Sequence, residues 1–228
     1  MKKEFKFNSD YCPIKKIQGI HPIKNLEKEV GMYSATPEFL IEHGGDISKN
    51  ILAQIPEWYF KEAKDRGLFP NIDVRIHRLY PGDYPAYPGW HCDGHFRETY
   101  FSQPDSNRVK VGKHIICVIS SVEGVSNPEF LDEDITLKLN PDSDHNLWGQ
   151  AHKEIERIKT EREVKTSFIK EGDIILFNPW TLHRVSPAKI RGWRLFFRMS
   201  MWDKPNLGKG GMLTKQEQVY KVLENSGW

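Results

Sequence analysis

The spacing of apolar residues predicts a helical stretch between residues 36 and 67. Within it, apolar side chains recur at steps of three and four residues, a period typical of helices that pack one face against a sheet. Thr36 followed by Pro37 predicts the start of a first helix, and Asp46 or Ser48 offers a second start.

After this stretch the pattern changes to short apolar runs separated by Gly, Pro, Asp and Asn. Eight such runs with turn residues between them predict a β-sandwich or jelly roll, so the fold class is mainly β. The predicted strands are Ile72–Tyr80, Gly89–Cys92, His114–Ser121, Glu129–Leu131, Ile135–Leu139, Thr166–Ile169, Asp173–Phe177 and Trp193–Trp202.

Three further segments flank or interrupt the predicted sheet. Residues 1–35 have no clear period, and residues 1–70 as a whole are expected to pack on the core as a helical or irregular segment. Residues 132–165 form a highly charged insertion in the core of residues 71–203, with an exposed helix predicted at 152–165. We interpret the insertion as a solvated element, with a flap over the site as the alternative. Residues 204–228 form a tail, and its last short helix is expected at 214–223.

Composition narrows the class of protein. Lys plus Arg (33) nearly equals Asp plus Glu (31), which argues against a protein that mainly coats nucleic acid. Three cysteines without a CxxC pair fit a reducing compartment. No apolar segment follows the charged N-terminus, and no apolar run is long enough to span a bilayer, so we expect a soluble cytoplasmic protein without a membrane partner.

One motif carries the candidate chemistry. His91 and Asp93 are two residues apart, so on a strand both side chains point to the same face and can hold one metal ion. A second histidine from a distant strand, His183, would complete a set of two imidazoles and one carboxylate. That set leaves coordination positions open and suits non-haem Fe(II).

Around these residues the sequence resembles the Fe(II)/2-oxoglutarate-dependent dioxygenase superfamily, over roughly Ile72 to Trp202. The family pattern is HxD, a distal His, and an Arg ten to fifteen residues later, often as RxS. The resemblance implies a double-stranded β-helix with flanking N-terminal helices and a short C-terminal helix. It also implies Fe(II), 2-oxoglutarate as co-substrate, O₂, and the release of succinate and CO₂ as a substrate is hydroxylated or otherwise oxidised. His91, Asp93 and His183 would be the metal-binding and catalytic residues.

The oxoglutarate-binding arginine is open between two positions. Arg198, fifteen residues after His183, is preferred because Ser200 completes the RxS form, and Arg194, eleven residues after His183, is the alternative. A planar guanidinium can hold a carboxylate through two hydrogen bonds. Strand alternation predicts that Arg194, Phe196, Arg198 and Ser200 share one face, and that the residues between them face the core.

Other polar and aromatic residues near the motif have simpler interpretations. Tyr80 belongs to an aromatic group that could hydrogen-bond oxoglutarate or line the substrate site, although packing explains it equally well. His95 is expected to form a nearby hydrogen bond and not to act as a fourth ligand, and His77 and His114 are expected to be satisfied sheet residues.

Two rival functions remain open from the sequence. A cupin-type metalloprotein would need the metal ligands without oxoglutarate chemistry, and a non-catalytic binding module would use the β-helix as a scaffold only. The substrate is not identified: a small molecule is ranked first, followed by a protein side chain and a nucleobase.

Overall fold

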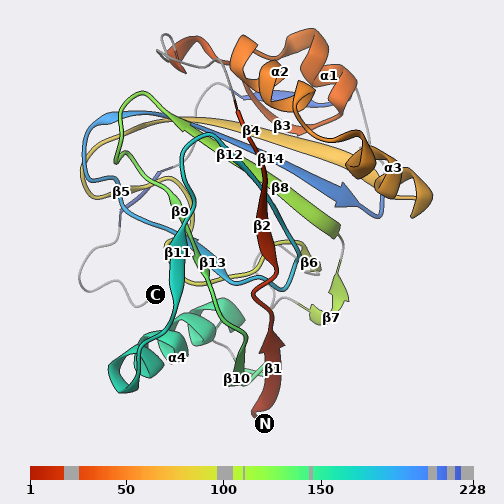
Figure 1. The fold of residues 1–228 in the computed structure, drawn as a ribbon. Coiled ribbons are helices and arrows are strands. Elements are labelled where there is room, and N and C mark those ends of the chain that lie inside the picture. Colours follow the sequence, from red (N-terminus) through yellow and green to blue (C-terminus); the bar gives the residue numbers. More distant parts are fainter. Residues whose placement is uncertain are drawn as a thin grey trace.

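The computed structural model describes residues 1–17, 26–96, 105–109, 111–143, 146–204, 210–214 and 219–221. Two antiparallel sheets face one another at its centre (Figure 1). The larger sheet has seven strands: β15 (Met212–Thr214), β3 (Gly31–Ala35), β4 (Phe69–Leu79), β14 (Gly192–Trp202), β8 (Val111–Ser120), β12 (Asp173–Phe177) and β2 (Tyr11–Lys16). The smaller sheet contains β11 (Thr166–Phe168), β9 (Pro128–Leu131) and β13 (His183–Val185), in that order.

The chain passes back and forth between these two sheets. It leaves β4 in the larger sheet, meets the smaller sheet at a bridge between His91 and His183, and returns in β8. It then enters β9 and β11, returns in β12, crosses to β13 and ends the circuit in β14. This winding is a double-stranded β-helix, so the fold class predicted from the sequence is confirmed.

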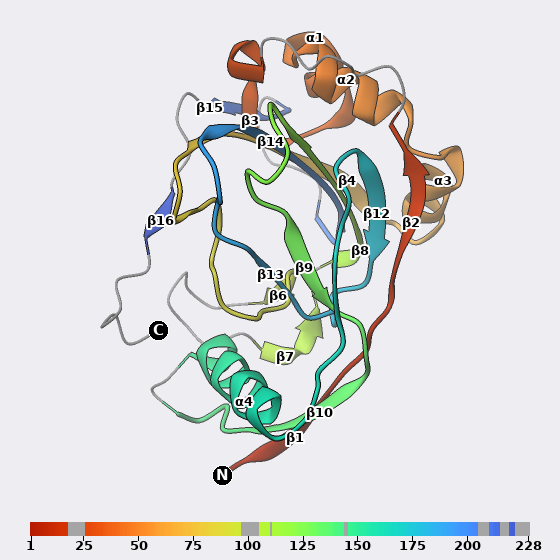
Figure 2. The same ribbon diagram turned by 60° about the vertical axis from the view of Figure 1, so that its left-hand side comes forward.

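Three helices cover the outer face of the larger sheet (Figures 1 and 2). They are α1 (Pro37–His43), α2 (Asp46–Ala53) and α3 (Glu57–Asp65), and their apolar residues form one buried cluster with β4, β8 and β14. Thr36 caps α1, as predicted, because its hydroxyl accepts a hydrogen bond from the Phe39 amide. α2 starts at the predicted Asp46, and Pro56 separates it from α3.

Two parts of the chain differ from the sequence prediction. The first 35 residues are not merely irregular, because they supply β1 (Lys3–Phe7), β2 and β3, and a 3-10 turn at Leu26–Lys28. In the tail, residues 212–214 form β15 and residues 220–221 form β16, which pairs with β5 (Asp83–Tyr84). The predicted helix at 214–223 is therefore wrong at these positions, and residues 215–218 and 222–223 lie outside the described residues.

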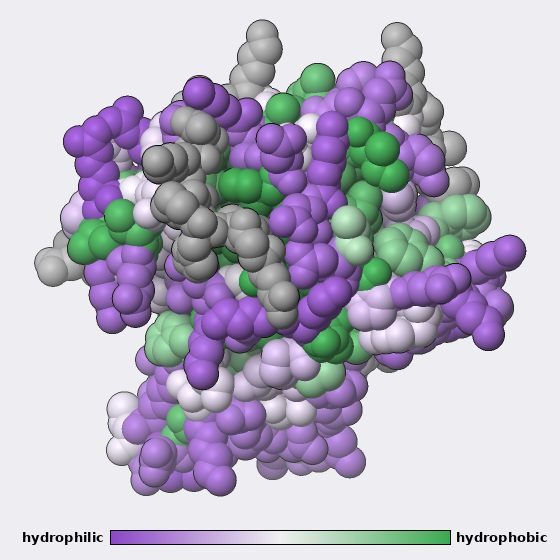
Figure 3. Space-filling model, turned by 45° about the horizontal axis from the view of Figure 1, so that its top comes forward, coloured by the Kyte–Doolittle hydropathy of each residue, from purple (hydrophilic) through white to green (hydrophobic). Residues whose placement is uncertain are grey.

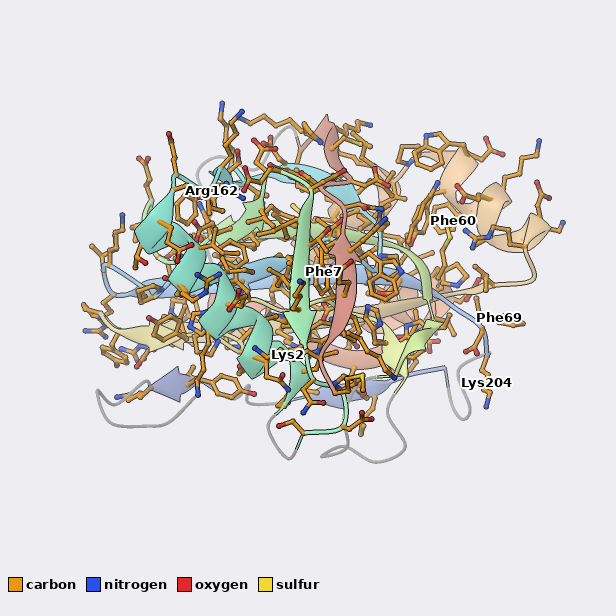
Figure 4. All side chains as sticks on the ribbon, turned by 90° about the horizontal axis from the view of Figure 1, so that it is seen from below. Lys2, Phe7, Phe60, Phe69, Arg162 and Lys204 are labelled. Carbon is orange, nitrogen blue, oxygen red and sulfur yellow. The ribbon has the colours of Figure 1, made fainter. Side chains whose placement is uncertain are left out.

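The charged insertion is an ordered strand and helix. β10 (Ile135–Leu139) pairs with β1, and α4 (Leu147–Glu161) packs beside them. The helix starts five residues before the predicted position. Figure 4 shows α4 from below, with Arg162 just past its C-terminal end and Phe7 on the neighbouring β1. Phe7 is 1% exposed and meets Trp148 of α4 at 6.3 Å between ring centroids.

The short strands β6 (His95–Phe96) and β7 (Asp105–Val109) form a separate antiparallel pair. No helix among the described residues is long and apolar enough to cross a membrane. Hydrophilic residues cover most of the face in Figure 3, with hydrophobic residues visible in small patches between them.

Candidate metal centre

The structure brings the three predicted metal ligands together. His183 is the first residue of β13, and His91 bridges to it through two backbone hydrogen bonds of 3.0 Å. Asp93 Oδ1 lies 4.0 Å from His91 Nε2, and Asp93 Oδ2 lies 3.6 Å from His183 Nε2. All three ligand atoms lie within 4.8 Å of one another. Metal–ligand bonds of about 2 Å would place neighbouring ligand atoms roughly 3 Å apart, so an ion would draw these side chains closer together.

The backbone sets which nitrogen of each histidine can bind metal. His91 Nδ1 lies 2.7 Å from the Gly89 carbonyl, and His183 Nδ1 lies 3.1 Å from the Thr181 carbonyl. A carbonyl only accepts, so in the neutral rings Nδ1 carries the proton and donates it. The lone pair of each Nε2 then faces Asp93. This is the arrangement of protein groups that holds a metal-ligating histidine in one tautomer.

Burial and charge keep the ligands in their metal-binding protonation states. Burial, together with the neighbouring His183, lowers the pKa of His91 to about 4. Burial alone would raise the pKa of Asp93, but Arg198 and the two histidines hold it well below its ordinary value. At neutral pH the site therefore offers an uncharged imidazole and a carboxylate.

Arg198 is already bound to carboxylates. Its Nη1 donates to Asp93 Oδ2 at 2.7 Å, and its Nη2 donates to Asp73 Oδ2 at 2.6 Å. Both edges of the guanidinium that could grip an oxoglutarate carboxylate face these acids. Arg198 thus lies directly next to the predicted metal ligand Asp93.

Arg194 has the opposite surroundings. It is 1% exposed, its Nε donates to the Ser126 carbonyl at 3.0 Å, and its guanidinium lies over the Phe196 ring. Among the described residues no acidic side chain pairs with it, and its Nη2 has no hydrogen-bond partner. Burial and the nearby Arg75 lower its pKa to about 9. A buried cation in this state is stabilised by any anion that reaches it.

One cavity joins Arg194 to the metal ligands. Its volume is about 640 Å³. Its walls include the three metal ligands, Arg75 and His77 of β4, and Arg194, Phe196 and Arg198 of β14. Asn146 and Trp148 at the start of α4 also line it. Phe130 stacks on the His183 ring at 5.4 Å and Phe177 meets its edge at 5.2 Å, so apolar rings surround that ligand.

The predicted alternation of β14 is confirmed. Arg194, Phe196 and Arg198 face the cavity, whereas the residues between them lie in the core beneath the helices. Those core residues are Trp193, Leu195, Phe197, Met199 and Met201.

Two other residues predicted as possible oxoglutarate contacts, Ser200 and Tyr80, have partners within the chain. Ser200 is bound to His114 Nδ1 at 2.8 Å. His114 Nε2 is buried without a hydrogen-bond partner among the described residues, so this histidine is only partly satisfied. Tyr80 is 44% exposed, packs against the guanidinium groups of Arg78 and Arg191, and does not line the cavity. His95 forms a hydrogen bond to the Pro179 carbonyl at 3.0 Å, as expected.

The sequence reasoning missed the polar wall formed by β4. Asp73, Arg75 and His77 alternate with the apolar Ile72, Val74 and Ile76, and this period of two places all three polar residues on the interior face. The signal was present in the sequence. Asp73 could have been identified as the partner of an interior arginine, because a buried carboxylate requires one.

No protein-family model matches the chain, and no curated protein sequence is significantly similar to it. Solved structures similar to the chain include AviO1 from Streptomyces viridochromogenes Tue57, at 13% identity and a TM-score of 0.41, covering 88% of this chain and 93% of that one. They also include HygX from Streptomyces hygroscopicus with nickel and 2-oxoglutarate bound, at 10% identity and a TM-score of 0.38, covering 89% and 85%. An N-substituted L-amino acid dioxygenase from Burkholderia ambifaria AMMD is 15% identical with a TM-score of 0.35, covering 80% and 77%. Because these TM-scores are below 0.5, the fold assignment rests on this chain's own strand order: the chain is a double-stranded β-helix with a His-Asp-His cluster at its interior.

Proposed function

We propose that the protein is an Fe(II)- and 2-oxoglutarate-dependent oxygenase in which His91, Asp93 and His183 hold the metal. The observation that carries this proposal is the convergence of their ligand atoms in a cavity that also contains a buried arginine with no acidic partner among the described residues. Two imidazoles and one carboxylate leave metal positions open for a co-substrate and O₂.

We further propose that Arg194, and not Arg198, binds the distal carboxylate of oxoglutarate. Arg194 has free donor capacity, is buried and faces the same cavity as the metal ligands. Arg75 adds a second positive charge close enough to lower the pKa of Arg194, which favours an anion at this end of the cavity. Arg198 is committed to Asp93 and Asp73.

Each residue then has a distinct role. When bound, Fe(II) supplies O₂ activation coupled to oxidative decarboxylation of oxoglutarate to succinate and CO₂. Arg198 orients the Asp93 carboxylate and keeps it ionised. Phe130 and Phe177 restrict water around His183. Arg194 fixes the co-substrate in one orientation, which the reaction requires because small displacements of reacting groups cost large factors in rate.

A cavity of about 640 Å³ falls within the range of small-molecule sites, which supports a small-molecule substrate over a protein side chain or nucleobase.

Titration calorimetry of 2-oxoglutarate into the Ni(II)-loaded protein tests this proposal without turnover. We expect oxoglutarate to bind one site in the wild type. In Arg194→Met we expect its affinity to be reduced roughly 100-fold, since a charge-assisted hydrogen-bonded pair contributes about 3 kcal/mol. The exposed Tyr80→Phe is the control, with unchanged affinity. If the wild type binds metal but not oxoglutarate, the result would favour a cupin-type metalloprotein. If the wild type binds neither, it would favour a non-catalytic binding module.

A further inference from the structure

Two residues that adjoin the metal ligands point away from the metal. Trp90 precedes His91, and Arg184 follows His183. Because successive side chains of extended backbone face opposite sides, both turn outward when the histidines turn inward. Trp90 is fully buried in the cluster that contains α4, and the Arg184 guanidinium lies over the Trp90 ring at 4.5 Å.

One carboxylate of α4 holds both of these residues. Glu156 Oε1 accepts a hydrogen bond from Trp90 Nε1 at 3.1 Å and another from Arg184 Nη1 at 3.1 Å. Arg184 Nε also donates to Glu129 Oε2 at 2.6 Å, on the strand next to β13. The Lys159 ammonium group also lies over the Trp90 ring, 5.0 Å from its centroid. The helix of the charged insertion is thus tied to both ligand-bearing segments.

Among the described residues, the backbone pairing between these two segments is limited to one bridge. His91 is joined to His183 by an isolated bridge and not by a continuous ladder. The spacing of the two imidazoles therefore depends on the contacts that hold each segment from outside. Burial would raise the pKa of Glu156, but the Trp90 hydrogen bond and the charges of Lys159 and Arg184 lower it, so the tie is charged at neutral pH.

We propose that Glu156 is a positioning residue of the metal centre, which sets the spacing of His91 and His183 through Trp90 and Arg184. This inference rests on the proposed metal binding by the His91-Asp93-His183 cluster. The insertion of residues 132–165 would then help to position the metal ligands from the side away from the cavity. It also contributes Asn146 and Trp148 to the cavity wall. Outer partners that orient metal-ligating histidines typically change metal affinity by about 10- to 100-fold when removed.

Co(II) alone is a suitable probe, because its affinity and its visible absorption both report on ligand geometry. We expect Glu156→Ala to raise the Co(II) dissociation constant by roughly 10-fold and to alter the absorption of the bound ion. Glu156→Gln, which keeps an acceptor for Trp90 but loses the charge, should fall between Glu156→Ala and the wild type. Glu154→Ala is the matched control: Glu154 is on the same helix and pairs with Arg157 on the outer side. It should leave Co(II) affinity within about twofold of the wild type.

A double-mutant cycle with Trp90→Phe separates positioning from general stability. Trp90→Phe removes the indole donor but keeps an aromatic ring, so its effect on Co(II) affinity should not add to that of Glu156→Gln. This pair also serves if Glu156→Ala does not fold. The inference is overturned if the Glu156 variants lower only the melting temperature while Co(II) affinity matches that of Glu154→Ala, or if the cycle is additive. Failure of the wild type to bind Co(II) would instead overturn the proposed metal site itself.

Discussion

Replacing Arg194 with methionine should make the metal-free protein more stable while weakening oxoglutarate binding. Arg194 is buried without an acidic partner among the described residues, so its charge opposes folding. Methionine keeps an unbranched apolar stem in the same space and removes the charge.

The magnitude follows from the lowered pKa. A guanidinium pKa that falls from 12.5 to about 9 corresponds to about 5 kcal/mol against the charged form in the folded state. Because the folded pKa is below the unfolded one, this cost is fully present below about pH 9 and is lost only at higher pH. The lost hydrogen bond to Ser126 offsets about 1 kcal/mol, and imperfect packing offsets more, so we expect a net gain of about 2 kcal/mol. For a chain of this size that gain raises the melting temperature by roughly 4–8 °C.

Arg198→Met is the matched comparison, because Arg198 lies on the same face of the same strand. There the substitution leaves the half-buried Asp93 and the buried Asp73 without their cation, and we expect a loss of roughly 3–5 kcal/mol. Thermal and urea unfolding at pH 7 with a chelator measure both variants. Equal destabilisation by the two substitutions would refute the reasoning, since it would mean that Arg194 is as well paired as Arg198.

Three further predictions concern the protonation of buried histidines, stabilisation by bound metal and the N-terminal cap of α1. Burial lowers the pKa values of His91 and His114 to about 4 and about 3, so between about pH 6.5 and 4 the unfolded chain binds two protons that the folded chain does not. As the pH is lowered through this range, the free energy of unfolding of the metal-free protein should therefore fall by roughly 1.4 kcal/mol per pH unit for each histidine. In His114→Gln only His91 remains, so the pH dependence of stability measured from urea midpoints should be about half that of the wild type. An unchanged slope would contradict the assigned protonation. Co(II) at 100 times its dissociation constant should add about 2.7 kcal/mol of stability, with the gain reversed by EDTA and absent in His183→Ala. Thr36→Ala should cost about 1 kcal/mol in unfolding experiments and Thr36→Ser very little, because the hydroxyl caps α1, and equal losses would argue against the cap.

The features that the sequence predicted well are those with a strong local signal. The face of β14 follows from its period of two, and the start of α1 follows from Thr36 and Pro37. The convergence of His183 with His91 and Asp93 was predicted only through the ordered motif, since no local rule joins strands so far apart in the chain.

The features that it missed depend on tertiary partners. β1 is short, with only Phe5 and Phe7 alternating, and β2 has little apolar periodicity; both are strands because β10 and β12 offer edges with which they pair. The pairing of Arg198 with Asp73 gave no signal in the sequence, because the two residues are 125 positions apart. The sequence did not distinguish Glu156 from the other acidic residues of its charged helix, because most carboxylates on such a helix face solvent.

An anaerobic titration of the protein with Fe(II) and 2-oxoglutarate tests the central claim most directly. A visible metal-to-ligand charge-transfer band should grow to saturation at one Fe(II) and one oxoglutarate per chain. The same titration of Asp93→Ala and His183→Ala should give no band. Absence of the band in the wild type, or its persistence in both variants, would contradict the assignment of His91, Asp93 and His183 as the iron site.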